Sequence, residues 1–240
     1  MRERPILFSG PMVRAILDGS KTQTRRIVKP AEVHACEWMA GPWRRPDGSL
    51  AKGEDGTWSF GSQGVGRHDP SNFFVEHRVR CPYGEPGDRL WVRETFAARD
   101  DVDPTTDPEK ARHYAIYRAD GERDLDNEWH SYGRGCWRPS IHMPRWASRI
   151  HLEIASVRVE RLQDINEDDA RAEGVVPFKH IGADQHIAGD LADRTQATHP
   201  HTLALAVLWD EINGERASWA SNPWVWVVSF KRIERASEAA

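Results

Sequence analysis

The chain has 240 residues, of which 39% are hydrophobic and 29% charged, and its net charge is −4. No apolar run approaches the ~18 residues of a membrane-spanning helix, and domains dedicated to duplex DNA are usually basic. Eleven Trp residues exclude disorder throughout, because disordered chains are poor in aromatic side chains. The composition therefore predicts a folded protein with a modest, Trp-rich core, polar loops and no membrane segment.

The cysteines and the first residues of the chain indicate its compartment. Cys36, Cys81 and Cys136 lie far apart and the sequence has no CxxC pair, so we expect neither a disulfide framework nor a zinc knuckle. Residues 1–6 (MRERPI) lack the apolar core of a secretory signal. These features predict a cytoplasmic protein with reduced thiols, and we expect it to use no metal and no cofactor.

The N-terminal segment predicts a strand, a helix and a second strand. Residues 5–8 (PILF) are typical of a strand. Pro11 suits the first turn of a helix, apolar residues then recur at helical spacing, and Gly19 is a natural helix terminator. Residues 24–29 (TRRIVK) predict the second strand, which Pro30 ends.

Three long polar stretches interrupt the regular pattern. Residues 30–86 are rich in Gly, Pro, Arg and Trp, with a short hairpin expected around Trp58–Phe60. Residues 97–145 contain a predicted strand at His113–Ala119, and residues 177–199 are dotted with Gly, Asp and His. Structureless stretches of this length are uncommon inside a compact domain. We therefore interpret all three as insertions into a smaller core domain.

Regular elements return between and after the insertions. Residues 89–95 (RLWVRET) alternate like a strand, and so do residues 149–162, with a possible bulge after Ile154. A short helix is expected to begin after its cap, Asn166, and to end at Gly174.

The C-terminal part predicts one longer helix and one buried strand. Residues 201–213 have the spacing of an amphipathic helix. Its apolar side is expected to consist of Leu205, Leu208, Trp209 and Ile212. Residues 224–230 (WVWVVSF) are almost continuously apolar, which fits a strand buried on both faces. The order of elements predicts a single α+β domain, 1–240, built on a curved sheet or a small barrel.

The most informative motif is residues 19–26, GSKTQTRR, between the first helix and the second strand. It contains G-x-K-x-x-x-x-R and resembles the signature of the ASCH superfamily, whose members have a PUA-like barrel and are associated with RNA and nucleoside substrates. The flanking regular elements, about half of the chain, fall where that family places its own. The resemblance implies a PUA-like small curved β-barrel with flanking helices, and the long loop insertions resemble those of phage- or prophage-associated members.

One branch of the superfamily is closer still. The small bacterial N4-acetylcytidine amidohydrolases carry G-x-K-T-x-T-x-R, and their catalytic residues are a Lys and a Thr of this motif with a Glu of the later short helix. The resemblance implies Lys21, Thr24 and Glu173 as the catalytic residues, with a nucleoside or base as the substrate. Arg25 departs from the pattern, because that position is usually apolar.

The chemistry of amide hydrolysis is compatible with these three residues. The reaction needs a nucleophile, a base and an acid for the leaving amine. Lys21 could be the base if burial lowers its pKa, Thr24 could be the nucleophile or orient a water, and Glu173 could shuttle the proton. Residues three apart on a strand face opposite sides, so Lys21 and Thr24 converge only if Lys21 lies in a bent turn, which Gly19 allows.

Three further residues are candidates for substrate contacts. Arg26 closes the motif and could bind a phosphate or carboxylate, or pair with Glu173. Thr22 is the motif's other hydroxyl. Glu94 ends a predicted strand and is a second candidate acid, although a partnership with Arg93 or Arg26 is the simpler interpretation.

Aromatic residues and a loose His/Cys group complete the candidates. Trp91, Trp224 and Trp226 could stack on a base, but core packing is the preferred interpretation. The cluster 137–146 would lie near the mouth of the site or cover an open edge of the barrel. A metal site is not expected, because no standard ligand spacing joins the three polar residues of this region. These three are His130, Cys136 and His142.

Two other functions remain open from the sequence. The local basic run, Lys21, Arg25 and Arg26, could bind RNA without chemistry, or cleave it as a ribonuclease using the same Lys and a Glu. The insertions could instead serve as partner surfaces of a phage morphogenesis protein. The net charge of −4 favours a small nucleoside over a long nucleic acid. The sequence does not predict an oligomeric state.

Overall fold

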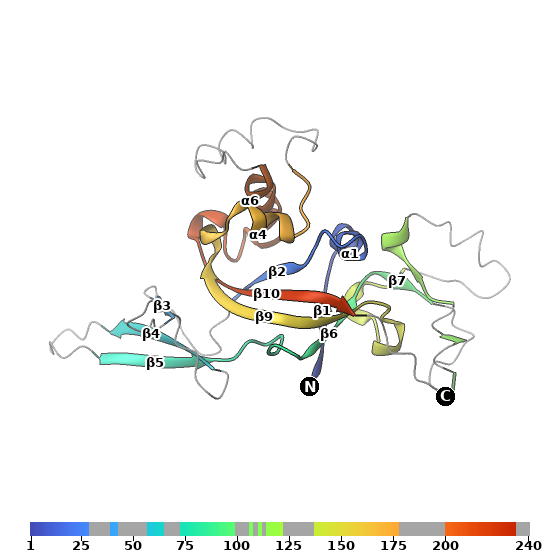
Figure 1. The fold of residues 1–240 in the computed structure, drawn as a ribbon, viewed down its shortest axis with the longest axis horizontal. Coiled ribbons are helices and arrows are strands. Elements are labelled where there is room, and N and C mark those ends of the chain that lie inside the picture. The colour runs from blue at the N-terminus through green and yellow to red at the C-terminus, as the bar shows by residue number, and fades with distance from the viewer. Residues whose placement is uncertain are drawn as a thin grey trace.

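The structure of the chain is a computed structural model that describes residues 1–28, 39–42, 57–64, 73–98, 106–107, 110–111, 114–121, 137–177 and 200–233. Its centre is a five-stranded mixed sheet with the strand order β1-β6-β9-β10-β2 (Figure 1). Strands β1 and β6 are parallel, and the other neighbours are antiparallel. The strands are β1 (Glu3–Leu7), β2 (Gln23–Ile27), β6 (Arg89–Arg93), β9 (His151–Arg161) and β10 (Trp224–Ile233).

The apolar run of the last strand is explained by its position. Strand β10 lies between β9 and β2, and its side chains alternate between two cores. Trp226 and Val228 pack into the larger cluster, whereas Val225 and Val227 pack into the cluster beneath the later helices. The prediction of a strand buried on both faces is confirmed, and the strand runs from Trp224 to Ile233.

Strand β9 is irregular where the sequence suggested a bulge. Ser229 of β10 pairs with Ser156, and the next residue, Phe230, pairs with Ile154. Ala155 is therefore the additional residue, and such an insertion increases the local bend of a strand. This bulge lies in the middle of the strand that joins β6 to β10 in the sheet.

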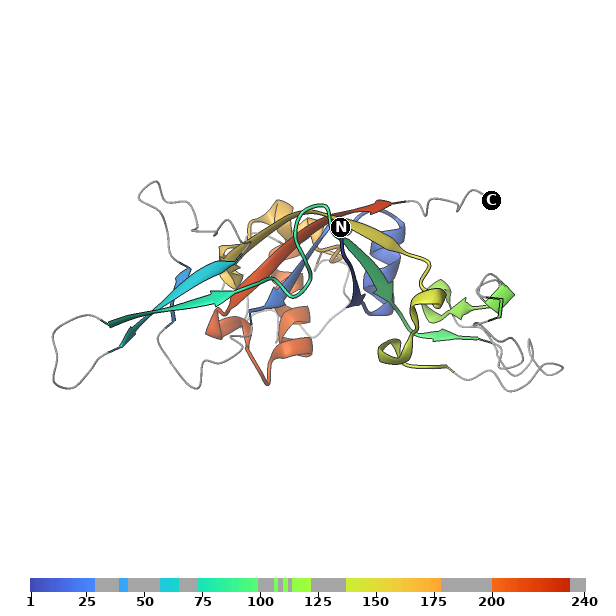
Figure 2. The ribbon, with the colours of Figure 1, turned by 90° about the horizontal axis from the view of Figure 1, so that it is seen from below.

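Helices cover both faces of the sheet (Figures 1 and 2). The predicted first helix is confirmed as α1 (Gly10–Leu17), which buries Val13, Ala15 and Ile16. Helices α4 (Glu167–Ala172) and α6 (Pro200–Asn213) contribute to the second core cluster with Val225 and Val227. Short 3₁₀ turns flank these elements at η4 (Leu162–Asp164) and η6 (Trp219–Ser221).

The two later helices differ in how well the sequence predicted them. The N-cap of α4 is confirmed, because the Asn166 side chain accepts a hydrogen bond from the Asp169 amide at 2.8 Å. In α6 the predicted apolar side is only partly buried: Leu205 and Trp209 are buried, but Ile212 is 55% exposed. The buried face extends instead to Leu203, Ala204 and Ala206.

The sheet is open, so the described strands do not close into the small barrel that was one expectation, and the other expectation, a curved sheet, describes them. Strands β1 and β2 are its two edges and do not pair with each other. A side chain connects the two edge strands, because an Arg26 Nη of β2 donates to the Leu7 carbonyl of β1 at 2.6 Å. Ile6, Phe8 and Val28 meet in the same core. The five strands therefore form a curved sheet, in which side-chain contacts and not strand pairing connect the two edge strands.

The insertion at 30–86 contains a sheet of its own. Strands β3 (Met39–Pro42), β4 (Trp58–Gly64) and β5 (Phe73–Val79) are antiparallel neighbours in that order. The ribbon projects away from the central sheet (Figure 2). The predicted hairpin at Trp58 is confirmed and is longer than expected. Cys81, at its base, is a buried free cysteine, while Cys36 and Cys136 lie outside the described residues.

The insertion at 97–145 has a small third core. Strands β7 (Phe96–Ala97) and β8 (Ile116–Tyr117) pair, and 3₁₀ turns follow at η1 (Arg118–Asp120), η2 (Ser140–His142) and η3 (Arg145–Ala147). The predicted strand at 113–119 is thus limited to two residues, because η1 begins at Arg118; His113 lies outside the described residues. The members of this core include Phe96, Tyr117, Met143 and Ala147.

The segment 137–146 covers the β1–β6 side of the sheet. Arg93 of β6 donates to the carbonyls of Ile141 and Met143, and Arg145 forms a two-bond ion pair with Glu3 of β1 at 2.6 and 2.8 Å. Of the two alternatives for this cluster, the structure supports the covered edge. Residues 178–199 of the third insertion lie outside the described residues. Among the helices that are described, none is long and apolar enough to cross a membrane.

Candidate functional site

The motif places Lys21 in a bend before β2. Gly19 has a φ of +84°, a conformation that favours glycine, and the Lys21 amide donates to the Ala15 carbonyl at the end of α1 at 2.8 Å. Lys21 then forms an isolated antiparallel bridge with Glu173. The expected bent turn is confirmed, and it turns the Lys21 side chain toward the end of α4.

Glu173 reaches the motif because α4 ends against it. Glu173 is the C-cap of the helix, and Gly174 follows with a φ of +73°. A Cβ atom on Gly174 would lie 2.7 Å from the Lys21 Cβ and 2.8 Å from the Ala15 Cβ. Only a glycine allows this approach, so the α4 terminus, α1 and the motif form one tightly packed junction.

A buried ion pair joins the two ends of this junction. The Lys21 Nζ lies 2.9 Å from a carboxylate oxygen of Glu173 and donates to its carbonyl at 2.7 Å. The side chains are 0% and 4% exposed. Burial lowers the pKa of Lys21, Glu173 opposes this by favouring the charged amine, and the Arg26 and Arg25 charges add to the lowering. The direction is the one a general base requires.

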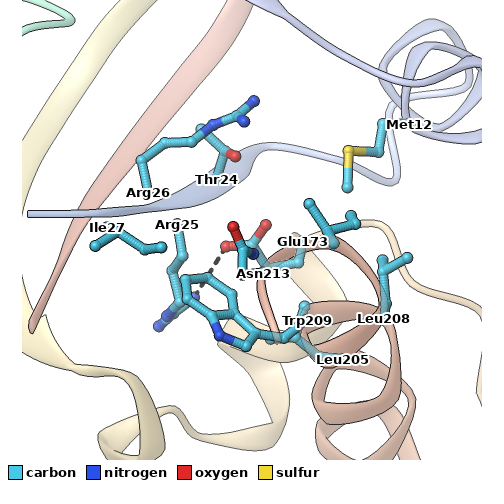
Figure 3. A pocket seen from close by; sticks show the side chains of 11 residues that line it. Met12, Thr24, Arg25, Arg26, Ile27, Glu173, Leu205, Leu208, Trp209 and Asn213 are labelled. Carbon is cyan, nitrogen blue, oxygen red and sulfur yellow. Dashed lines mark hydrogen bonds and ion pairs between the residues drawn. The ribbon is translucent and has the colours of Figure 1, made fainter. Parts of the chain in front are cut away.

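Arg25 holds the other oxygen of the same carboxylate. Its Nη1 lies 3.2 Å from Glu173 Oε1 (Figure 3), and its side chain is 1% exposed. Its Nη2 pairs with Asp169 at 3.1 Å and with Glu160 at 3.3 Å. Arg158 also pairs with both of these carboxylates. The charges of three cations thus balance those of three carboxylates, in a network that runs from the interior to the surface. The cations are Lys21, Arg25 and Arg158, and the carboxylates are Glu173, Asp169 and Glu160.

The partly exposed carboxylate of this network is held in its charged form. Burial of Asp169 opposes ionisation, but the Arg158 and Arg25 charges outweigh it and hold the pKa of Asp169 below its usual range. The charged Asp169 therefore holds one guanidinium nitrogen of Arg25, and the other nitrogen contacts Glu173.

Thr24 lies beside this network and opens onto a cavity. It is 3% exposed as a whole residue. Thr24 and Glu173 both line a cavity of about 70 Å³ between β2 and α6 (Figure 3). Lys21 is not in its wall.

A larger cavity lies on the other side of the same junction. It has a volume of about 580 Å³ and is bounded by α1, the segment after α4, and α6. Met12, Glu173 and Leu208 line both cavities. Only the larger one falls in the range of about 300–1,000 Å³ typical of pockets for small molecules.

The structure thus brings Lys21, Thr24 and Glu173 to one junction, but not into one hydrogen-bonded chain. The Lys21 amine bonds to Glu173 and not to Thr24. Glu173 is the residue that touches both the amine and the cavity.

The structure corrects the partner expected for Glu173 within the motif. Glu173 pairs with Arg25 rather than with Arg26. The Arg26 guanidinium lies 5.3 Å from the centre of the Phe8 ring and bonds to Leu7, although it also lines the small cavity. Thr22 is exposed, its carbonyl accepts a hydrogen bond from Phe230, and it lines neither cavity.

Glu94 belongs to a different cluster. It is 1% exposed and forms a two-bond ion pair with Arg149 at 2.9 and 3.0 Å. The expected partners, Arg93 and Arg26, are wrong, because Arg93 instead donates to backbone carbonyls. Burial raises the pKa of Glu94 against the opposing effect of Arg149. Glu94 does not line either cavity described above.

The tryptophans considered for stacking lie elsewhere. Trp226 is 1% exposed in the main core, as expected. Trp224 packs against that core beneath the Arg161 guanidinium at 4.3 Å, and Trp91 lies near Arg93. Another tryptophan, Trp209, lines the small cavity.

The remaining candidates concern metal binding and RNA. His142 lies in η2, while His130 and Cys136 lie outside the described residues. In the part of the chain that the structure describes, no group of three or more His, Cys, Asp or Glu side chains could hold a metal ion. Of the three cations proposed to bind RNA, Lys21 and Arg25 are internal and engaged in ion pairs.

Sequence reasoning missed two kinds of residue. Arg25 was noted as a departure from the motif and as part of the basic run, but not as a partner of Glu173, and Asp169 was not among the candidate site residues. Trp209 and Leu208 were expected in the core. Their sequence signal is helical periodicity, which does not distinguish a core face from a cavity wall.

A comparison with models of protein families, with curated proteins and with solved structures finds no match to this chain.

Proposed function

We propose that the protein is an amidohydrolase that removes the acyl group from N4-acylated cytidine, cytosine or a related modified nucleoside. The observation that carries the proposal is that Thr24 and Glu173 line the same cavity, while Glu173 forms a buried ion pair with Lys21. The substrate class comes from the resemblance of residues 19–26 to the signature of the ASCH superfamily.

The proposed reaction uses the three residues in sequence. The Thr24 oxygen attacks the acyl carbon while its proton passes to the Glu173–Lys21 pair, with Lys21 as the base that ultimately holds it. The C–N bond then breaks, and the same pair returns the proton to the leaving amine. Water hydrolyses the threonine ester, which releases the carboxylic acid and restores the hydroxyl. Alternatively, Thr24 orients the water and that water attacks directly.

The charge balance of the junction supports this assignment. Glu173 lies between two cations, so a proton can move between its carboxylate and the Lys21 amine without creating a net buried charge. Burial lowers the pKa of Lys21, which brings a base of this type closer to neutral pH. Arg26 in the cavity wall is a candidate to polarise the acyl oxygen.

The test is the loss of ultraviolet absorbance of N4-acetylcytidine with the wild type, Lys21→Ala and Thr24→Val. We expect turnover by the wild type and a loss of at least about 10³-fold in kcat for either variant. Thr24→Val keeps the shape of the side chain, so its Tm should stay close to that of the wild type and a loss of turnover would not reflect unfolding. If no member of a panel of N4-acylated cytosines is hydrolysed, the proposal fails.

A further inference from the structure

The small cavity has a size that matches a particular part of such a substrate. An apolar cavity of about 150 Å³ accommodates benzene, with six heavy atoms. By proportion, the cavity of about 70 Å³ beside Thr24 accommodates about three. A nucleoside is far too large for it, whereas an acetyl or propionyl group fits.

The wall of this cavity has an apolar part and a polar part. Most of the apolar side comes from α6, with further contributions from α1 and β2 (Figure 3). These side chains are Leu205, Leu208, Trp209, Ile212, Met12 and Ile27. The polar part consists of Thr24, Arg25, Arg26 and Glu173, together with Asn213 at the end of α6. The cavity therefore suits a short hydrocarbon group attached to a carbonyl that faces Thr24.

The larger cavity can hold the rest of the molecule. It shares Met12, Glu173 and Leu208 with the small one, so the two are separated only by these three side chains. Methionine is flexible and adapts to what it packs against. A substrate bound across this divide would place its scissile amide next to Glu173.

We infer that the cavity between β2 and α6 is an acyl-group pocket that restricts the enzyme to short acyl chains, with the nucleoside portion in the cavity between α1 and α6. This inference rests on the proposed function and specifies its substrate. Ile212 limits the length of the chain, because it lines the cavity and is 55% exposed, which places it where the cavity meets solvent.

The kinetic test compares N4-acetyl, N4-butyryl and N4-hexanoyl cytidine. We expect kcat/KM of the wild type to fall at least about tenfold from acetyl to hexanoyl, since one misfitted methylene already costs that much in a tight pocket. Ile212→Ala should raise kcat/KM for hexanoyl relative to acetyl by about tenfold or more. Val207→Ala is the matched control, because Val207 is on the same helix but lines only the larger cavity, and it should leave the chain-length preference as in the wild type.

A binding measurement separates this inference from the proposed function. Methyl resonances of Ile27 and Leu205 are followed by NMR while acetamide or hexanamide is added. We expect acetamide to shift these resonances in the wild type and hexanamide to do so only in Ile212→Ala. Binding of this kind without hydrolysis of any acyl cytidine would overturn the proposed function and keep the acyl-sized pocket. Equal hydrolysis of all chain lengths, or no shift with acetamide, would overturn the pocket.

Discussion

At the residue scale, the junction depends on a carboxylate held between two internal cations. Glu173 meets Lys21 through one oxygen and Arg25 through the other, and all three side chains are at most 4% exposed. Burying such charges costs several kcal/mol each unless their partners are in place. The arrangement therefore fixes the carboxylate in one orientation, which a positioned proton carrier requires.

Replacement of Arg25 by methionine tests this arrangement. We expect Arg25→Met to lower the free energy of unfolding by about 3 kcal/mol, because it leaves Glu173 with one partner. Losing a nearby positive charge should also raise the pKa of Lys21, so the acidic limb of the pH–rate profile should move to higher pH. Arg158→Met is the control: it touches neither Glu173 nor Lys21, and its cost should be about 1 kcal/mol or less. Equal effects of both variants in urea unfolding and pH–rate profiles would contradict the special role of Arg25.

At the element scale, a second buried cluster attaches the 97–145 insertion to the sheet. Arg149 pairs with Glu94 at the end of β6 and with Asp120 of η1 at 2.7 Å. Its guanidinium lies 4.0 Å from the centre of the Tyr117 ring, and the Tyr117 hydroxyl donates to Ala147 of η3 at 2.8 Å. One arginine thus joins three elements that are distant in the sequence.

Tyr117 makes this attachment sensitive to alkaline pH. Burial raises the pKa of Tyr117 to about 12, despite the opposing charge of Arg149, whereas an unfolded tyrosine ionises near 10. Its contribution is intact below about pH 10 and is lost as the pH rises toward 12, by up to about 2–3 kcal/mol. Urea unfolding between pH 9 and 11.5 should therefore show a steeper decline for the wild type than for Tyr117→Phe. Parallel declines would contradict the assignment.

At the scale of the whole molecule, the core is shared between the central sheet and an insertion. Trp58, at the start of β4, belongs to the main core cluster and meets Trp226 with ring centres 6.2 Å apart. At the same end of the ribbon, Val79 of β5 pairs with Trp58 and packs against this cluster, and Cys81 belongs to it. The ribbon is therefore anchored at its base by part of the central core rather than joined by a flexible linker.

Removal of the Trp58 side chain should destabilise the entire domain. We expect Trp58→Ala to lower the free energy of unfolding by about 3–5 kcal/mol in a single transition, because it opens a cavity against Trp226. Leu7→Ala, at a position that is 39% exposed, should cost much less. Two separate transitions in thermal unfolding of the wild type would show that the ribbon and the sheet do not share one cooperative core.

Local sequence patterns predicted the elements of the central domain well. The cap at Asn166, the bulge of β9 and the buried β10 each follow from side chains within a few residues, so short-range spacing is sufficient to predict them. The turn before β2 was predicted from Gly19 in the same way. The chemical interpretation of Lys21, Thr24 and Glu173 came from the resemblance of the motif, and their roles remain a prediction.

What the sequence by itself determined is therefore the set of strands and helices and the bend that carries Lys21. Only the tertiary structure decided that the sheet stays open, that Arg25 rather than Arg26 meets Glu173, and that Glu94 lies in a separate cluster. Arg25 and Glu173 are 148 residues apart. Contacts of that range depend on register and on which face of an edge strand meets a helix end, and a one-residue change of register reverses every side chain.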